Sequence, residues 1–229
     1  MNTLAIDTST RTLSLALAID GTCVSYRNIV LNRRMADAIV PHITAFLRRR
    51  GLGLEDIGAV VAGRGPGSFT SLRVGVATVK GLCFGRDIPV AGIPSPAAVA
   101  AAVAATPGKT DCKLCVISDA RRGLLYAATY RIEEERPVAA GDCQLLPWKE
   151  LRRQLTKPVV FAGDGVTLHR EDIVKAFGPD AALTDPKFLT PQARYLLPAG
   201  LAAIKDGRAG DAATLEPLYL YAEDCQVRP

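Results

Sequence analysis

The sequence has 229 residues, of which 48% are hydrophobic and 22% are charged, which is typical of a folded globular protein and excludes a disordered or fibrous one. Its longest apolar run, residues 97–105, is far shorter than the roughly 20 residues that a membrane-spanning helix needs, and the first residues do not resemble an export signal. The net charge of +5 permits contact with nucleic acid, but 23 acidic residues accompany the 28 basic ones, so charge is only weak support for an RNA partner. Six dispersed cysteines in a chain of this size favour reduced thiols and a cytoplasmic location.

The first hundred residues predict a β-meander that leads into alternating helices and strands. Apolar runs and the Asp20-Gly21 turn predict three initial strands, and the next helix has apolar residues at helical spacing and arginines in its last turn. Pro41 lies inside that helical pattern, which predicts either a bend or a later start. Helices between strands allow parallel pairing, so a mixed sheet is expected. The expected elements are strands 3–6, 13–19, 23–30, 57–62 and 89–93 and helices 35–50 and 69–84.

The second half predicts a weaker round of the same pattern. An alanine-rich helix at 96–105 is followed by a hydrophilic stretch at 106–111 that is typical of a domain boundary. Both halves begin with paired strands and pass into alternating helices and strands, which favours a structural duplication. The last helix contains Pro198, which is expected to kink it. The expected elements are strands 113–118, 124–130, 141–146 and 159–162, helices 148–155, 168–177 and 191–206, and an extended tail at 214–221.

A glycine-rich segment, Gly63-Arg64-Gly65-Pro66-Gly67-Ser68-Phe69-Thr70-Ser71-Leu72-Arg73-Val74-Gly75, links a buried strand to a helix. Backbone N–H groups and hydroxyls at a helix start are ready to bind an anion, which would make the segment a phosphate loop. It lacks the lysine of a P-loop and the dinucleotide fingerprint, so a tight strand-to-helix turn is the alternative. Spacing alone favours the tight turn.

This segment and the opening Leu4-Ala5-Ile6-Asp7-Thr8-Ser9-Thr10 resemble the TsaB (YeaZ) family, which is related to actin, Hsp70 and the sugar kinases. The resemblance is dense to about residue 131 and weaker beyond it, with further matches at 88–93, 118–123 and 217–220. It implies an α/β protein with the actin-like ATPase (RNase H-like) fold, in which each of two lobes has a mixed sheet flanked by helices. The expected lobes are residues 1–105 and a reduced C-terminal lobe, 106–229, whose last helix packs back on the first.

The same resemblance implies where a nucleotide site would lie. In the superfamily the turn after the first strand and its counterpart in the second lobe hold phosphate and metal, which places Asp7, Thr8 and Ser9 opposite Asp119. The glycine turn at Gly163 and Asp164 would face the base of the nucleotide. Carboxylates and hydroxyls suit Mg²⁺ and phosphate, but ordinary turn capping explains the same residues. The implied site is vestigial, and no cofactor is expected to be required.

The resemblance further implies that this chain is not the catalyst. The catalytic paralogue TsaD carries a metal-binding His-x-x-x-His motif after the strand that corresponds to 89–93, where this sequence has Ser95 and Val99. The two histidines of the chain, His42 and His169, lie in expected helices without a second ligand at metal-binding spacing. No catalytic residue and no metal site are therefore assigned.

The expected helix 69–84 is apolar nearly all round, so it should be covered on two sides, by the sheet and by either a neighbouring helix or a second protein. The resemblance implies that the N-terminal helices pair with TsaD, or with a second copy when the chain is alone, with TsaE and tRNA completing the assembly that transfers threonylcarbamoyl to tRNA adenosine. Met35 and Tyr221 depart from the family pattern of histidine and arginine. The alternative function is a small kinase or ATPase that uses Asp7 and Asp119 around Mg-ATP. The expected partner-binding residues are Met35, Ile39, Ile43, Leu72, Val76, Val79 and Cys83.

Overall fold

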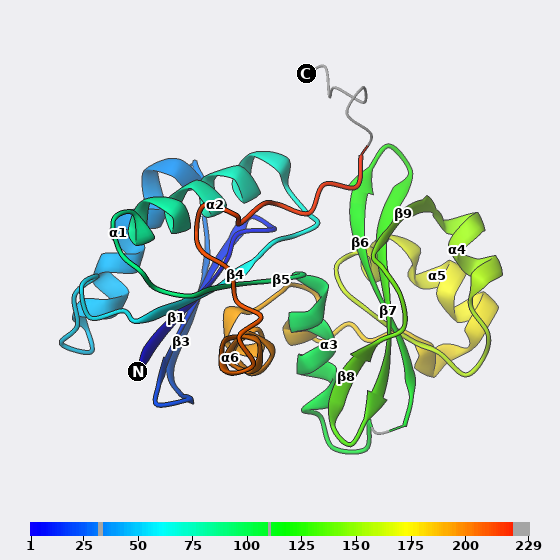
Figure 1. Cartoon of the computed structure of the whole chain (residues 1–229). Coiled ribbons are helices and arrows are strands. Elements are labelled where there is room, and N and C mark those ends of the chain that lie inside the picture. Colours follow the sequence, from blue (N-terminus) through cyan, green and yellow to red (C-terminus); the bar gives the residue numbers. More distant parts are fainter. Residues whose placement is uncertain (32–33, 110, 222–229) are drawn as a thin grey trace.

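The computed structural model describes residues 1–31, 34–109 and 111–221, which form two lobes, each built on a five-stranded mixed sheet (Figure 1). In the first sheet the strand order is β3-β2-β1-β4-β5, with antiparallel pairing from β3 to β1 and parallel pairing from β1 to β5. The meander and the parallel crossovers predicted from the sequence are thus both present. The strands are β1 (Asn2–Asp7), β2 (Thr12–Ile19), β3 (Thr22–Val30), β4 (Ala59–Gly63) and β5 (Val90–Ile93).

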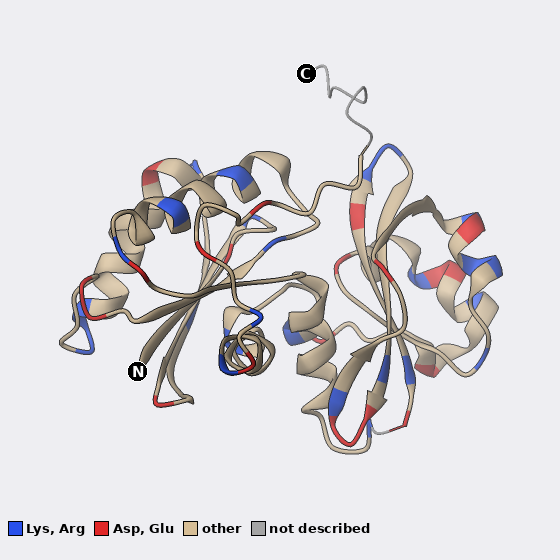
Figure 2. Ribbon diagram, viewed as in Figure 1, with Lys and Arg blue, Asp and Glu red and all other residues tan. Residues whose placement is uncertain are grey.

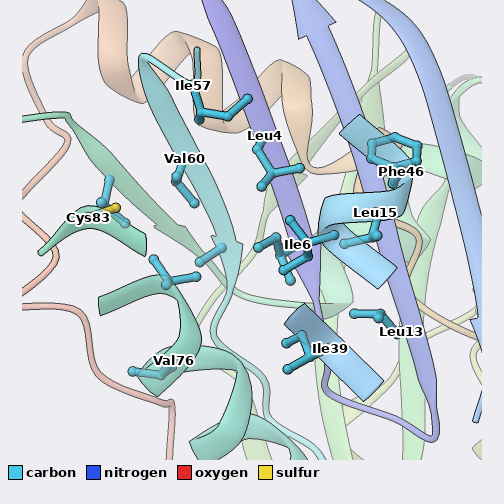
Figure 3. Packing of buried hydrophobic residues seen from close by; sticks show 14 of the residues in the cluster. Leu4, Ile6, Leu13, Leu15, Ile39, Phe46, Ile57, Val60, Val76 and Cys83 are labelled. Atoms are coloured by element: carbon cyan, nitrogen blue, oxygen red, sulfur yellow. The ribbon is translucent and has the colours of Figure 1, made fainter. Parts of the chain in front are cut away.

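Both faces of the first sheet are covered, which explains why its central strands are apolar throughout rather than alternating. On one face α1 (Met35–Arg48) and α2 (Phe69–Cys83) enclose a core of leucine, isoleucine and valine side chains (Figure 3). On the other face the 3-10 helix η3 (Ala193–Tyr195) and α6 (Leu197–Lys205) pack on small residues such as Ala5 and Ala16. Small side chains on that face let these C-terminal elements approach the sheet closely.

The second sheet has the order β10-β6-β7-β8, and β9 pairs with the other end of β7. The helices α4 (Trp148–Gln154) and α5 (Gly165–Phe177) cover one face around Phe161, and α3 (Pro96–Ala104) covers the other. Two further 3-10 helices, η1 (Pro179–Ala181) and η2 (Pro186–Phe188), follow α5. The strands are β6 (Lys113–Arg121), β7 (Leu124–Glu133), β8 (Arg136–Ala139), β9 (Gln144–Pro147) and β10 (Val160–Ala162).

The helix α3 lies between the two lobes rather than inside the first one. Val99 and Val103 join the core beneath the second sheet, while Ala98 belongs to the cluster on the first sheet. A helix that is apolar all round is buried all round, as its alanine-rich sequence indicates. The last helix, α6, packs on β4 and β5 of the first lobe, so the polypeptide crosses from the first lobe to the second and back.

Some element boundaries differ from the sequence-based expectation. The short strand β8 was missed, because its residues carry no apolar alternation, and the strand expected at 141–146 begins at Gln144. Pro41 is accommodated within α1, which begins at Met35. The expected helix 191–206 is divided into η3 and α6, and Pro198 lies in the first turn of α6, where its missing N–H has no helical partner to lose.

Lysine and arginine residues are spread over both lobes and alternate with acidic residues along the chain (Figure 2). Within the described part of the chain, no helix is long and apolar enough to cross a membrane.

Candidate functional site

Asp7, at the end of β1, is the centre of a buried hydrogen-bond cluster. Its Oδ1 accepts a hydrogen bond from the backbone N–H of Ser9 at 2.9 Å and another from the Ser9 hydroxyl at 2.6 Å, and its Oδ2 accepts one from the Ser95 hydroxyl at 2.6 Å. Asp7 is only 1% exposed. Burial raises the pKa of Asp7, and the hydrogen bonds from Ser9 and Ser95 oppose this effect. Both oxygens of the Asp7 carboxylate therefore accept hydrogen bonds from side-chain or backbone groups of the protein itself.

Ser95 connects this cluster to the glycine-rich segment. Its hydroxyl accepts a hydrogen bond from the backbone N–H of Gly65 at 3.0 Å while donating to Asp7, and its own N–H donates to the Gly65 carbonyl at 2.8 Å. Ser95 and Val99 occupy the positions where the resemblance places the metal-binding histidines of the paralogue. Both are buried, Ser95 in the Asp7 cluster and Val99 in the core beneath the second sheet. The sequence alone did not indicate this contact, since 88 residues separate Ser95 from Asp7.

The glycines of the segment make room for the turn that follows β1. A Cβ atom on Gly63 would collide with the Asp7 carboxylate, one on Gly67 with the backbone of Ser9, and one on Gly75 with the side chain of Thr8. The backbone N–H of Ser68 also donates to the Ser9 carbonyl at 2.7 Å. Thr8 and Ser9 are each only 2% exposed as a result. This packing supports the tight-turn interpretation over a phosphate loop.

The second group of predicted residues lies at the end of β6 and the start of α5. The backbone N–H of Asp119 donates to Asp164 Oδ1 at 3.3 Å, and Arg121 contacts Asp119 through its backbone N–H at 2.8 Å and its guanidinium at 3.1 Å. The side chain of Asp119 is 25% exposed, so it is far more accessible than Asp7. Burial raises the pKa of Asp164, and a hydrogen bond from Ser118 opposes this.

Gly163 adopts a φ of +99°, and a Cβ atom there would meet the Ile117 carbonyl, so this turn packs closely on β6. The structure therefore brings Asp119 next to Asp164, and Asp7 next to Thr8 and Ser9. Among the contacts of the described residues, none joins these two groups. A hollow of about 10 Å³ lies beside the C-terminal end of α2, and another of about 220 Å³ lies at the C-terminal end of α1. Neither is lined by Asp7, Asp119 or Asp164. No cluster of metal-ligating side chains occurs within the described ranges.

The seven residues expected to bind a partner face inward. All are 7% exposed or less, and Figure 3 shows Ile39, Val76 and Cys83 within the core of the first lobe. Their helical spacing reflects packing on the sheet, so they cannot form a partner surface in this conformation, and the expectation is corrected accordingly. The outward surface of α1 and α2 is formed by other residues. The seven are Met35, Ile39, Ile43, Leu72, Val76, Val79 and Cys83.

The raised pKa of Asp164 predicts a pH-dependent stability difference. Between the ordinary aspartate pKa of 3.8 and the higher pKa of Asp164 in the folded state, the folded protein holds a proton that the unfolded chain has lost, so stability falls as pH rises through this window. Asp164→Asn cannot titrate. Its free energy of unfolding relative to the wild type should therefore increase with pH across the window, as measured by urea unfolding from about pH 4 to about pH 7.

The exposed aspartate Asp180, in η1, supplies the matched control, since Asp180→Asn removes the same charge from the surface. If the difference in free energy of unfolding between Asp164→Asn and the wild type stayed constant with pH, this would contradict a raised pKa of Asp164 in the folded protein.

Comparisons with known proteins agree on one family. The family model described as TsaD, tRNA N6-adenosine threonylcarbamoyltransferase, matches residues 30–224. The chain is 31% identical to the tRNA threonylcarbamoyladenosine biosynthesis protein TsaB of Escherichia coli, over 96% of this chain and 94% of that protein. It is 28% identical to TsaB of Bacillus subtilis over 100% of this chain and 97% of that protein.

Solved structures give the same result. YeaZ from Pseudomonas aeruginosa is similar at a TM-score of 0.79 and 27% identity, covering 96% of this chain and 99% of that one. The ethanolamine utilization protein EutJ from Carboxydothermus hydrogenoformans is similar at a TM-score of 0.50 and 13% identity, over 86% and 90% of the two chains, which reflects the actin-like fold alone. With two lobes that each contain a mixed sheet flanked by helices, and with full-length relatives at this identity, the chain belongs to the TsaB (YeaZ) family of tRNA threonylcarbamoyladenosine biosynthesis proteins.

Proposed function

We propose that this protein is a non-catalytic subunit of the machinery that transfers a threonylcarbamoyl group to tRNA adenosine, and that it acts by binding and orienting the paralogue TsaD. TsaE and tRNA would complete the assembly, and a second copy of the chain would take the place of TsaD when the protein is alone. The proposal rests on one observation. At the positions where a catalyst of this fold would need reactive or metal-binding side chains, the side chains of this protein are engaged in packing and in hydrogen bonds within the protein.

The surroundings of three residues support a non-catalytic role for this protein. Ser95 and Val99 are buried in hydrogen bonding and packing where TsaD is expected to carry histidines. Asp7 has hydrogen-bond donors on both carboxylate oxygens. A kinase of the same fold would instead need Asp7 free to hold Mg²⁺ through water.

The outer face of α2 is the surface that we assign to the partner. Arg73, Ala77 and Gly81 are exposed at helical spacing, and Phe69 and Phe84 flank them at 51% and 88% exposure. Small residues in the middle allow another helix to approach closely, while aromatic and arginine side chains at the ends are residue types that often carry binding energy. This face replaces the buried residues first expected to make the contact.

Ala77→Arg tests the assignment, because it places a long charged side chain in the middle of this face without touching the core. We expect it to abolish the complex with TsaD from the same organism, measured by size-exclusion chromatography with light scattering. Ala202→Arg is the matched control, since Ala202 is an exposed alanine on α6, on the opposite side of the first sheet. It should leave the complex intact.

An ATP titration of the free chain completes the experiment. Absence of a complex with the wild-type chain, together with Mg-dependent ATP binding that depends on Asp119, would overturn the proposal in favour of a kinase or ATPase. Loss of the complex in both arginine variants would place the partner surface elsewhere.

A further inference from the structure

Arg194, in η3, contacts two tyrosine rings beside the outermost strand of the first sheet. Its guanidinium carbon lies 4.1 Å from the ring centroid of Tyr26, on β3, and 4.5 Å from that of Tyr195. Arg194 Nη2 also donates a hydrogen bond to the Tyr195 hydroxyl at 3.0 Å. Two rings and one hydrogen bond hold the planar guanidinium in a fixed orientation.

Most hydrogen-bond donors of this guanidinium have no acceptor among the residues that the structure describes. A guanidinium carries five N–H donors, and the bond to Tyr195 is the single one that Arg194 makes within the described ranges. Its Nε is buried without an acceptor there, and no described carboxylate forms an ion pair with it. Arg86, by contrast, donates to three backbone carbonyls. The positive charge of Arg194 and several of its donors are therefore available to a ligand.

A chain of hydrogen bonds directs the amide of Asn28 toward the same surface. The backbone N–H of Ala193 donates to the Ser14 hydroxyl at 2.7 Å, and that hydroxyl donates to Asn28 Oδ1 at 2.6 Å. Because Oδ1 is used in this way, the NH₂ group of Asn28 points away from Ser14. Asn28 is exposed, and it lies two residues from Tyr26 on the same face of β3.

We propose that Arg194, Tyr195 and Asn28 form a binding site for a phosphate group. The guanidinium supplies a positive charge and paired donors that match phosphate oxygens. The Tyr195 oxygen accepts from Arg194, so its own hydrogen is directed elsewhere and can be donated to the ligand. The NH₂ group of Asn28 adds a donor from β3. Donors from three side chains suit the tetrahedral oxygens of phosphate, whereas the guanidinium alone would fill a planar carboxylate.

This site lies apart from the surface that we assign to TsaD. Figure 1 shows α1 and α2 on one side of the first sheet and α6 on the other, and η3 packs with α6. Phosphate binding at Arg194 and partner binding on α2 can therefore be tested separately, and failure of either proposal leaves the other standing.

Inorganic phosphate, titrated into the full chain at constant ionic strength, tests the site by NMR. The Nε–H signal of Arg194 is the reporter, and it should be resolved from those of exposed arginines because burial slows its exchange with water. We expect this signal and the side-chain amide signals of Asn28 to shift together and to saturate. The Nε–H signal of Arg86 should not move. Acetate, titrated in the same way, should bind more weakly because it is planar and carries less charge.

Three variants show whether the named side chains hold the phosphate, with binding followed through the backbone amides of residues 26–28. Arg194→Gln should weaken binding by roughly tenfold or more, since charge-assisted hydrogen bonds are lost. Tyr195→Phe, which removes one neutral donor, should weaken it by roughly fivefold. Arg208→Gln is the matched control. It removes the same charge from an exposed arginine that already pairs with Asp206, and it should leave the affinity unchanged.

Backbone amide shifts of the second sheet show that each variant is folded. The proposal would be overturned if the Arg194 signal did not saturate in the wild type, if acetate bound as tightly as phosphate, or if Arg194→Gln kept the wild-type affinity. An equal loss in Arg208→Gln would also overturn it, because phosphate would then respond to net charge alone. In each of these cases Arg194 would serve only to attach η3 to β3.

Discussion

Asp7→Ala is expected to lower the free energy of unfolding by roughly 3 kcal/mol or more, because it leaves several buried donors without an acceptor and each such group costs about 1–3 kcal/mol. The donors are the N–H and hydroxyl of Ser9 and the hydroxyl of Ser95. Urea unfolding followed by circular dichroism measures the change. A loss of this size would show that the carboxylate holds the turn after β1 against the start of α3.

Asp119→Ala is the matched control in the second lobe. Asp119 is partly exposed and its ion pair partner, Arg121, is 80% exposed, so the free energy of unfolding should change by less than about 1 kcal/mol. In an ATP-dependent enzyme the two aspartates would have parallel roles, and both variants would stay folded while losing nucleotide. Unchanged stability in Asp7→Ala would therefore contradict the structural role that we assign to it.

The sequence predicted the architecture of the first lobe well because local signals agree with the fold there. The Asp20-Gly21 turn lies between β2 and β3, and the apolar runs match β4 and β5. The direction of the strands followed from connection length, since a short turn permits antiparallel pairing and a helix permits parallel pairing. The order of the strands in the sheet, in which β4 pairs with β1, was not predicted. The second lobe was predicted less well, because β8 is short and largely exposed and lacks the apolar alternation on which such predictions depend.

The candidate site was predicted only in part, because its contacts join distant segments. Asp7, Thr8 and Ser9 are adjacent in sequence and were singled out together, but Ser95 was considered only as the replacement of a histidine. Its role depends on the position of α3 between the lobes. The sequence likewise left two interpretations of the glycine-rich segment, a phosphate loop and a tight turn. Only the fold shows that the turn after β1 packs against these glycines.

The partner residues were chosen wrongly for a general reason. Helical periodicity identifies the apolar side of α1 and α2, but it does not say whether a sheet or another protein covers that side. In α2 the buried row includes Val76 and Val79, and the exposed row includes Ala77 and Gly81. A helix that is apolar nearly all round can pack on the sheet with its larger side chains and contact another protein with its smaller ones.

Gly75→Ala is expected to destabilise the protein by roughly 1–2 kcal/mol, although alanine is the better helix former. The new methyl group would collide with the side chain of Thr8, which is only 2% exposed and has little room to move. Overpacking of this kind costs about 1–3 kcal/mol, and the gain in helix propensity of about 0.5–1 kcal/mol offsets only part of it. Urea unfolding compares the variant with the wild type.

Gly81→Ala, on the same helix, carries the opposite expectation. A Cβ atom at Gly81 meets nothing within 4 Å, and the residue is exposed, so the substitution should stabilise the protein by about 0.5–1 kcal/mol through helix propensity alone. Because both substitutions add one methyl group to α2, the difference between them isolates the contact with Thr8. If the two variants were equally stable, the turn after β1 would not be packed against α2, and the glycine-rich segment would be free to bind an anion instead.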